Sequence, residues 1–100
     1  MRITIQNIKD WAKPHPHKNG GKATRIVSRG LTISIVGGAM GLYGDFVEDF
    51  EMAIWENKND SWRTKFFYPE ATDDVVGYMS PEELEKVVNL VVGNSDFQVI

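Results

Sequence analysis

The sequence predicts an α+β domain: a four-stranded, mainly antiparallel sheet with an N-terminal and a C-terminal helix, in the order α-β-β-β-β-α. Two observations predict the sheet: apolar residues alternate with period two over residues 31–36, and they do so again over residues 50–56. A third predicts the last helix, since Ser80-Pro81 is a helix-start signal. One hundred residues form a single domain, residues 1–100, because half the chain would have too little core.

The first element is predicted to be a short helix capped by Thr4. Ile5 and Ile8 lie on one helical face, and Ile3 stands where a hydrophobic staple would contact Ile8. The helix is expected to stop before Pro14, because the residue preceding a proline avoids helical dihedral angles. The alternation of Ile3 and Ile5 supports a strand as the weaker alternative.

Arg29-Gly30 separates two segments of alternating polarity, which predicts a hairpin. A two-residue turn sets Ile26 opposite Ile33. A three-residue turn with Gly30 left-handed shifts this pairing by one residue. Both turns are compatible with the sequence.

Residues 37–49 begin with four glycines in eight positions and end in acids, which indicates a long surface loop. Exposed apolar and aromatic side chains on such a loop are suited to contact another protein. The loop and the next strand carry the expected partner-binding residues: Met40, Leu42, Tyr43, Asp45, Glu48, Asp49, Glu51 and Trp55.

Residues 50–56 and 62–68 are predicted to pair, because the apolar positions of both segments are even-numbered and demand an odd-length turn. A turn at 57–59 sets Ile54 opposite Trp62. The same register sets Phe50 opposite Phe66 and Glu51 opposite Lys65. The odd-numbered face then forms either an interface or a surface that a helix covers. A helix over residues 46–56, begun by Asp45 and Glu48 as a capping box, is the competing interpretation.

The final helix starts with Ser80 as N-cap, proline at the first helical position and a capping-box glutamate. Leu84, Val87, Val88 and Val91 follow at helical spacing, and Gly93 supplies a stop signal. The tail that follows is expected to pack or to add a short edge strand.

Composition narrows the class of protein. Without cysteine there is no disulfide framework, thiolate metal site or cysteine nucleophile. No apolar run reaches the roughly 18 residues that a membrane helix needs, and no signal peptide is recognisable, so a cytoplasmic location is expected.

The glycine-containing motifs do not match nucleotide-binding fingerprints. Gly20-Gly21-Lys22 lacks the Ser/Thr that meets magnesium in a P-loop, because Ala23 occupies that position. Residues 37–41 follow a strand, but the acids after them would repel a phosphate.

Metal and enzyme chemistry is also not expected. His15 and His17 have no carboxylate close in sequence to complete a metal shell. Asp73-Asp74 and the acids near residue 48 lack calcium-loop spacing. No serine–histidine–acid set is recognisable. We therefore expect no catalytic residue, no metal, no cofactor and no enzyme activity.

Charge is divided along the chain. Residues 1–44 hold seven basic residues and one acid, whereas 45–100 hold four basic residues and thirteen acids. The halves either neutralise each other or leave an acidic surface that imitates a phosphate backbone and occupies a nucleic-acid-binding groove. The alternative is direct nucleic-acid binding by the basic segment 13–29, which lacks interleaved aromatic residues.

Five segments carry a resemblance: residues 34–38, 42–45, 50–53, 73–78 and 80–84. In them the chain resembles small accessory proteins of phages and mobile elements, some of which act as anti-CRISPR or other host-defence inhibitors. The resemblance implies a non-enzymatic inhibitor that covers a surface of a host protein. It assigns a functional role to no individual residue of this chain. The sequence leaves the identity of the protein partner and the oligomeric state open.

Overall fold

The computed structural model describes residues 2–100 and shows an α+β architecture, as predicted, with a seven-stranded antiparallel sheet and three helices. The strands are β1 (Lys13–Pro14), β2 (Lys22–Ser28), β3 (Leu31–Gly37), β4 (Phe50–Glu56), β5 (Ser61–Trp62), β6 (Val75–Met79) and β7 (Gln98–Val99). The helices are α1 (Ile5–Asp10), α2 (Thr64–Phe67) and α3 (Pro81–Val92). The predicted sheet of four strands with two helices is therefore too simple.

The strand order follows the chain, β1-β2-β3-β4-β5, while β6 also pairs with β4 and β7 also pairs with β2. The outer edge of β2 is shared by β1 at one end and β7 at the other. The outer edge of β4 is likewise shared by β5 and β6. Apart from β7, which comes from the end of the chain and pairs with β2, the strands of the β1–β3 side come from the first half of the chain and those of the β4–β6 side from the second half.

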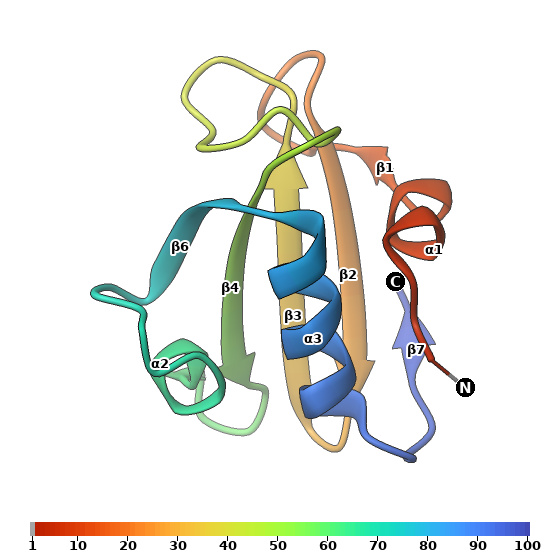
Figure 1. The fold of residues 1–100 in the computed structure, drawn as a ribbon, viewed down its shortest axis with the longest axis vertical. Helices are drawn as coiled ribbons and strands as arrows, with labels where there is room; N and C mark the ends of the chain where they lie inside the picture. Colours follow the sequence, from red (N-terminus) through yellow and green to blue (C-terminus); the bar gives the residue numbers. More distant parts are fainter. Residues whose placement is uncertain (1) are drawn as a thin grey trace.

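The helices gather on one face of the sheet, and Figure 1 shows α3 crossing in front of β3. Apolar residues of α3 pack with those of this sheet face in one buried cluster. The side chains that fill its centre are Ile8, Ile26, Ile33, Ile35, Phe50, Met52, Ile54, Leu84, Val88 and Val91.

The first helix is confirmed. Thr4 accepts a hydrogen bond from the Asn7 N–H, and the Asn7 side chain accepts one from the Thr4 N–H, which completes a capping box. Ile3 and Ile8 are both fully buried. The Asn89 side chain of α3 holds the Ile3 backbone through two hydrogen bonds of 2.8 Å, so the chain start is attached to the core.

The hairpin between β2 and β3 has the two-residue turn, with Ile26 opposite Ile33. Arg29 and Gly30 both have positive φ, 53° and 76°. This is the geometry of a tight turn whose twist matches the flanking strands. The Arg29 guanidinium also donates hydrogen bonds to carbonyls at the end of α3, those of Leu90 and Val91.

The strand interpretation of residues 50–56 is correct, whereas that of 62–68 is wrong. The turn has four residues, 57–60, so Trp62 pairs with Trp55 and lies on the other face from Ile54. After two residues of β5 the chain forms α2, which removes the predicted pairings of Phe66 with Phe50 and of Lys65 with Glu51.

Thr64 explains why the second segment turns away from the sheet. Its hydroxyl is fully buried, accepts a hydrogen bond from the Ile54 N–H and lies 2.6 Å from the Asp74 carbonyl. These contacts occupy the edge of β4 at Ile54 and attach the first residue of α2 to it, so the aromatic residues that follow do not continue β5 despite their strand propensity.

The strand β6 was not predicted, although its valines are typical of strands. The final helix is confirmed, with Ser80 accepting from the Glu83 N–H and Gly93 at its end. The predicted capping box is not formed, because the Glu83 carboxylate contacts the hydroxyls of Ser80 and Tyr68. The tail adds a short edge strand, β7, as one of its two expected outcomes.

Candidate functional site

The sheet has a second face, which we call the open face because no helix of residues 2–100 packs on it. Its side chains alternate with those of the core along the three long strands, and none belongs to the main buried cluster. The open-face residues of β2, β3 and β4 are Ala23, Arg25, Val27, Thr32, Ser34, Val36, Glu51, Ala53 and Trp55. Thr32, Val36 and Ala53 are buried among their neighbours, so the larger residues around them form the exposed part of this face.

Trp55 is the centre of an aromatic cluster on the open face. The guanidinium carbon of Arg25 lies 5.6 Å from its ring centroid, within the range of a cation–π contact. Trp62 meets Trp55 edge-on, with centroids 6.0 Å apart and ring planes at 87°. Trp62 is 48% exposed. Arg25, Trp55 and Trp62, which we call the Trp cluster, thus offer a rigid aromatic surface to a partner.

A second aromatic pair lies where the loop of residues 38–49, the acidic loop, meets β6. The rings of Tyr43 and Tyr78 are 6.1 Å apart, and the Tyr78 N–H donates to the Tyr43 carbonyl. Gly77 is required here, because a Cβ on it would lie 2.7 Å from the Tyr43 Cβ. The Glu51 carboxylate accepts the Tyr43 N–H at 2.9 Å and joins this pair to the open face.

Asp45 organises the acidic loop. Its carboxylate accepts the backbone N–H groups of Val47, Glu48 and Asp49 at 2.8, 2.9 and 3.1 Å. These hydrogen bonds stabilise the ionised form and lower the pKa of Asp45 from 3.8 to about 2. The Asp49 carboxylate in turn accepts the Asp45 N–H at 2.7 Å. Both acids therefore hold the loop in shape, besides giving it negative charge.

The early basic residues do not pair with these acids. Within residues 2–100, the ion pairs are Arg2 with Glu85 and Arg63 with Glu56. The charge division along the sequence is only partly kept in space, because the Lys18 ammonium lies beside Gly41 of the acidic loop and Arg2 pairs with Glu85 of α3. Lys13 and Arg25 lie toward the β1–β2 side, and the acidic loop enters β4 on the other side.

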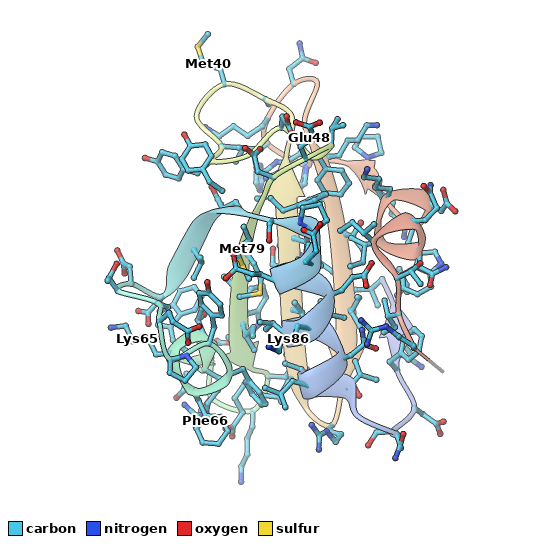
Figure 2. All side chains as sticks on the ribbon, viewed as in Figure 1. Met40, Glu48, Lys65, Phe66, Met79 and Lys86 are labelled. Carbon is cyan, nitrogen blue, oxygen red and sulfur yellow. The ribbon has the colours of Figure 1, made fainter. Side chains whose placement is uncertain are left out.

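The predicted partner-binding residues fall into three groups. Met40 is 96% exposed and points away from the body at the loop tip (Figure 2), and Glu48 is also exposed. Three carboxylates carry hydrogen bonds of the loop: Asp45, Asp49 and Glu51. Leu42 is half-buried, Tyr43 joins the tyrosine pair, and Trp55 lies in the Trp cluster.

Sequence reasoning missed Arg25, Trp62, Val75 and Tyr78 as members of this surface. Val75 lies opposite Ala53 and is 40% exposed. Trp62 was assigned to the opposite face by a turn one residue too short. A four-residue turn over 57–60, with its asparagines and aspartate, was the signal that would have placed it correctly.

The histidines are part of a structured loop. The Nδ1 atom of His15 accepts the N–H groups of His17 and Lys18 at 3.0 and 3.1 Å. Over residues 2–100 no group of three or more histidines, aspartates or glutamates is arranged to hold a metal ion. In the same part of the chain, none of the helices has the length and apolar character needed to cross a bilayer.

Comparison of the chain with protein-family models, with curated proteins and with solved structures found no match.

Proposed function

We propose that this protein is a non-enzymatic binding module whose open face, together with the acidic loop, binds a protein partner. The observation that carries the proposal is the Trp cluster, in which Trp55 and Trp62 remain partly exposed on a sheet face without a covering helix. Tryptophan, tyrosine and arginine dominate the binding energy of protein interfaces, and this surface combines all three.

The shape and charge of the surface support a folded protein as partner. Along β4, Glu51 and Trp55 are four residues apart, so their Cα atoms lie about 13 Å from each other. The tyrosine pair is attached at Glu51 and the Trp cluster is centred on Trp55. Two aromatic anchors at this spacing suit a shallow protein interface better than a small-molecule pocket. The basic and acidic sides of the sheet would orient the partner.

The biological role that we propose is that of a phage-type inhibitor acting in the cytoplasm on a nucleic-acid-binding host protein. The exposed carboxylates of the acidic loop supply the negative charge that such a protein attracts. Asp45 stays ionised at neutral pH because of its lowered pKa. Replacing Asp45, Glu48, Asp49 and Glu51 with lysine is a poor test of this role, since Asp45 and Asp49 also hold the loop together.

A sharper experiment changes one exposed apolar residue on each side of the molecule. Val75→Asp places a charge on the open face, and Leu90→Asp places the same charge on α3, where the leucine is 60% exposed. Immobilised wild-type protein and the Leu90→Asp variant should retain the same protein from a host lysate, and Val75→Asp should not. Equal retention by both variants would show that the open face is not the interface.

A second candidate function is favoured by the contact between Arg25 and Trp55. The basic segment 13–29 lacks aromatic residues of its own, but β3 brings it beside Trp55 of the acidic half. An indole beside a guanidinium is a stacking platform for single-stranded nucleic acid. Tryptophan fluorescence should then be quenched by an oligothymidylate at low salt. Unchanged fluorescence in the wild type would exclude this candidate.

A further inference from the structure

His15 begins the connection between β1 and β2, residues 15–21, which we call the histidine loop. Its Nδ1 atom accepts the backbone N–H groups of His17 and Lys18. Pro16 between them has no N–H, so these are the first two donors that follow His15 in the chain. Its backbone is also fixed, because the His15 N–H donates to the Gly21 carbonyl at 2.9 Å. The loop is thus built around one imidazole.

The imidazole does what the side-chain oxygen of asparagine or aspartate usually does in a loop, which is to accept the N–H groups that follow it. The Nδ1 atom of histidine lies as many bonds from the backbone as the Oδ1 atom of asparagine. His15 can take this role only while Nδ1 carries no proton, so the proton of the neutral ring is on Nε2. A protonated Nδ1 would be a donor facing two other donors, and both hydrogen bonds would break.

The histidine loop lies against the acidic loop, and Figure 1 shows both at the same end of the sheet. A Cβ on Gly21 would lie 3.2 Å from the Ala39 Cβ, and one on Gly41 would lie 3.1 Å from the Lys18 Nζ atom. The Lys18 ammonium is therefore next to the tip of the acidic loop. Because the Lys18 N–H is one of the two that His15 holds, the ring also fixes the position from which this side chain starts.

The basic and titratable groups around His15 come from its own loop and from the elements beside it. The His17 ring centroid lies 6.2 Å from that of His15. The other groups are Lys18 of the loop, Lys13 and Lys22 at its two ends, and Lys9 of α1 beside Gly20 and Gly21.

The acidic groups of the neighbouring elements have other contacts or are exposed. In the acidic loop, the carboxylates of Asp45 and Asp49 accept N–H groups of that loop, and Glu48 is exposed. In α1, Asp10 accepts a hydrogen bond from the Gln6 side chain. Over residues 2–100 no carboxylate forms an ion pair with His15. Its protonation would therefore gain no ion pair in place of the two lost hydrogen bonds.

We propose that His15 is a pH-dependent switch, whose neutral ring keeps the histidine loop ordered against the acidic loop and whose protonation releases both. Imidazoles ordinarily change charge near about pH 6.5, whereas carboxylates and lysines keep their charge there. The loops are thus held above this pH and released below it. The regulatory consequence rests on the proposed function, because the acidic loop carries proposed partner-binding residues. The switch itself does not.

Nuclear magnetic resonance of the isotope-labelled full chain, from about pH 8 to about pH 5, tests the switch. At the upper pH the ring nitrogen shifts of His15 should show the proton on Nε2. The amide signals of His17, Lys18, Ala39 and Gly41 should then move together with the titration of the His15 ring. Solvent exchange of the His17 and Lys18 N–H groups, relative to their intrinsic rates, should become roughly tenfold faster at the lower pH.

Three variants separate the switch from a general effect of pH. His15→Asn keeps an acceptor that does not titrate, so its Ala39 and Gly41 amides should not respond to pH. His15→Ala has no acceptor, and its loop N–H groups should exchange fast at both ends of the pH range. His17→Asn is the matched control, because only the backbone N–H of His17 takes part, and it should respond as the wild type does.

A proton on Nδ1 of the neutral ring would overturn the inference. So would a pH response of the acidic loop that persists in His15→Asn or disappears in His17→Asn. Ala39 and Gly41 amides that do not follow the His15 ring in the wild type would show that the two loops are not coupled, which also contradicts it. These measurements use the free protein, so the switch can fail while the proposed interface stands, and a failed Val75→Asp test leaves the switch intact.

Discussion

Arg25 on β2 and Trp55 on β4 are two strands apart, yet the guanidinium carbon lies 5.6 Å from the indole centroid. The contact is possible because the residues of β3 between them on the open face are small, Thr32 and Ser34. The long arginine side chain crosses above them and reaches the tryptophan. This contact connects the basic half of the chain with the aromatic residues of the acidic half.

Replacing Arg25 tests the strength of that contact. Arg25→Leu keeps an apolar side chain beside Trp55 and removes the cation, so it should lower the free energy of unfolding by about 0.5–1 kcal/mol. Denaturant unfolding followed by tryptophan fluorescence measures the change. Lys13→Leu, which removes another exposed cation, is the control and should have a smaller effect. If Arg25→Leu leaves the free energy of unfolding unchanged, the cation–π contact contributes nothing to stability.

Replacing Asp45 tests the organisation of the acidic loop. Because the folded-state pKa of about 2 lies below the ordinary value of 3.8, the ionised carboxylate stabilises the fold above about pH 4. This stabilisation should be lost as the pH falls from 4 toward 2. Asp45→Ala should have a lower melting temperature than the wild type at neutral pH. The melting temperature of Asp45→Asn, whose side chain still accepts hydrogen bonds, should lie between those of the wild type and Asp45→Ala.

The pH dependence of these variants provides the check. Between pH 4 and pH 2 the stability of Asp45→Asn should fall less than that of the wild type, measured by urea unfolding at each pH. Glu48→Gln serves as control, since its backbone N–H rather than its carboxylate takes part in the loop hydrogen bonds. If Glu48→Gln reproduces the effect, general charge repulsion is the cause.

Tyr68 and Glu83 make a second pH-dependent contact, between the end of α2 and the first turn of α3. The hydroxyl donates to the Glu83 carboxylate, and this hydrogen bond raises the pKa of Tyr68 from 10.0 to about 12. The raised pKa means that the contact stabilises the fold fully below pH 10 and is lost as the pH rises toward 12.

Ultraviolet absorbance titration of the phenols measures this effect. One phenol of the wild type should ionise near pH 12, and Tyr68→Phe should lack that step. Glu83→Gln should shift the step to a lower pH, because the carboxylate charge that disfavours the phenolate is gone. A titration curve unchanged in Tyr68→Phe would contradict the assignment.

Thr64 should be the residue of the β4–α2 connection that tolerates substitution least. Thr64→Val keeps the volume and leaves the buried Ile54 N–H without its hydrogen-bond acceptor, at a cost of about 1–3 kcal/mol. Thermal and denaturant unfolding measure the loss. The exposed Thr72 gives a matched control, and Thr72→Val should change the free energy of unfolding by less than about 0.5 kcal/mol.

Local signals in the sequence were sufficient to predict the elements whose ends are fixed by contacts between residues close in sequence. Thr4 and Ser80 cap their helices through contacts three residues away, and Arg29-Gly30 has the turn conformation that a tight hairpin needs. The alternation of Phe50, Met52 and Ile54 predicted the buried face of β4. In each case the deciding interaction is between residues close in sequence, so the pattern carries the information.

The pairing partners of β4 and the composition of the open face were decided by tertiary structure alone. The hydroxyl of Thr64 turns the chain into α2, and a four-residue turn moves Trp62 to the face of Trp55. The sequence by itself determined an α+β domain with one apolar face per strand and a division of charge. Only folding brought Arg25 beside Trp55, because that contact crosses β3 and depends on the register of three strands.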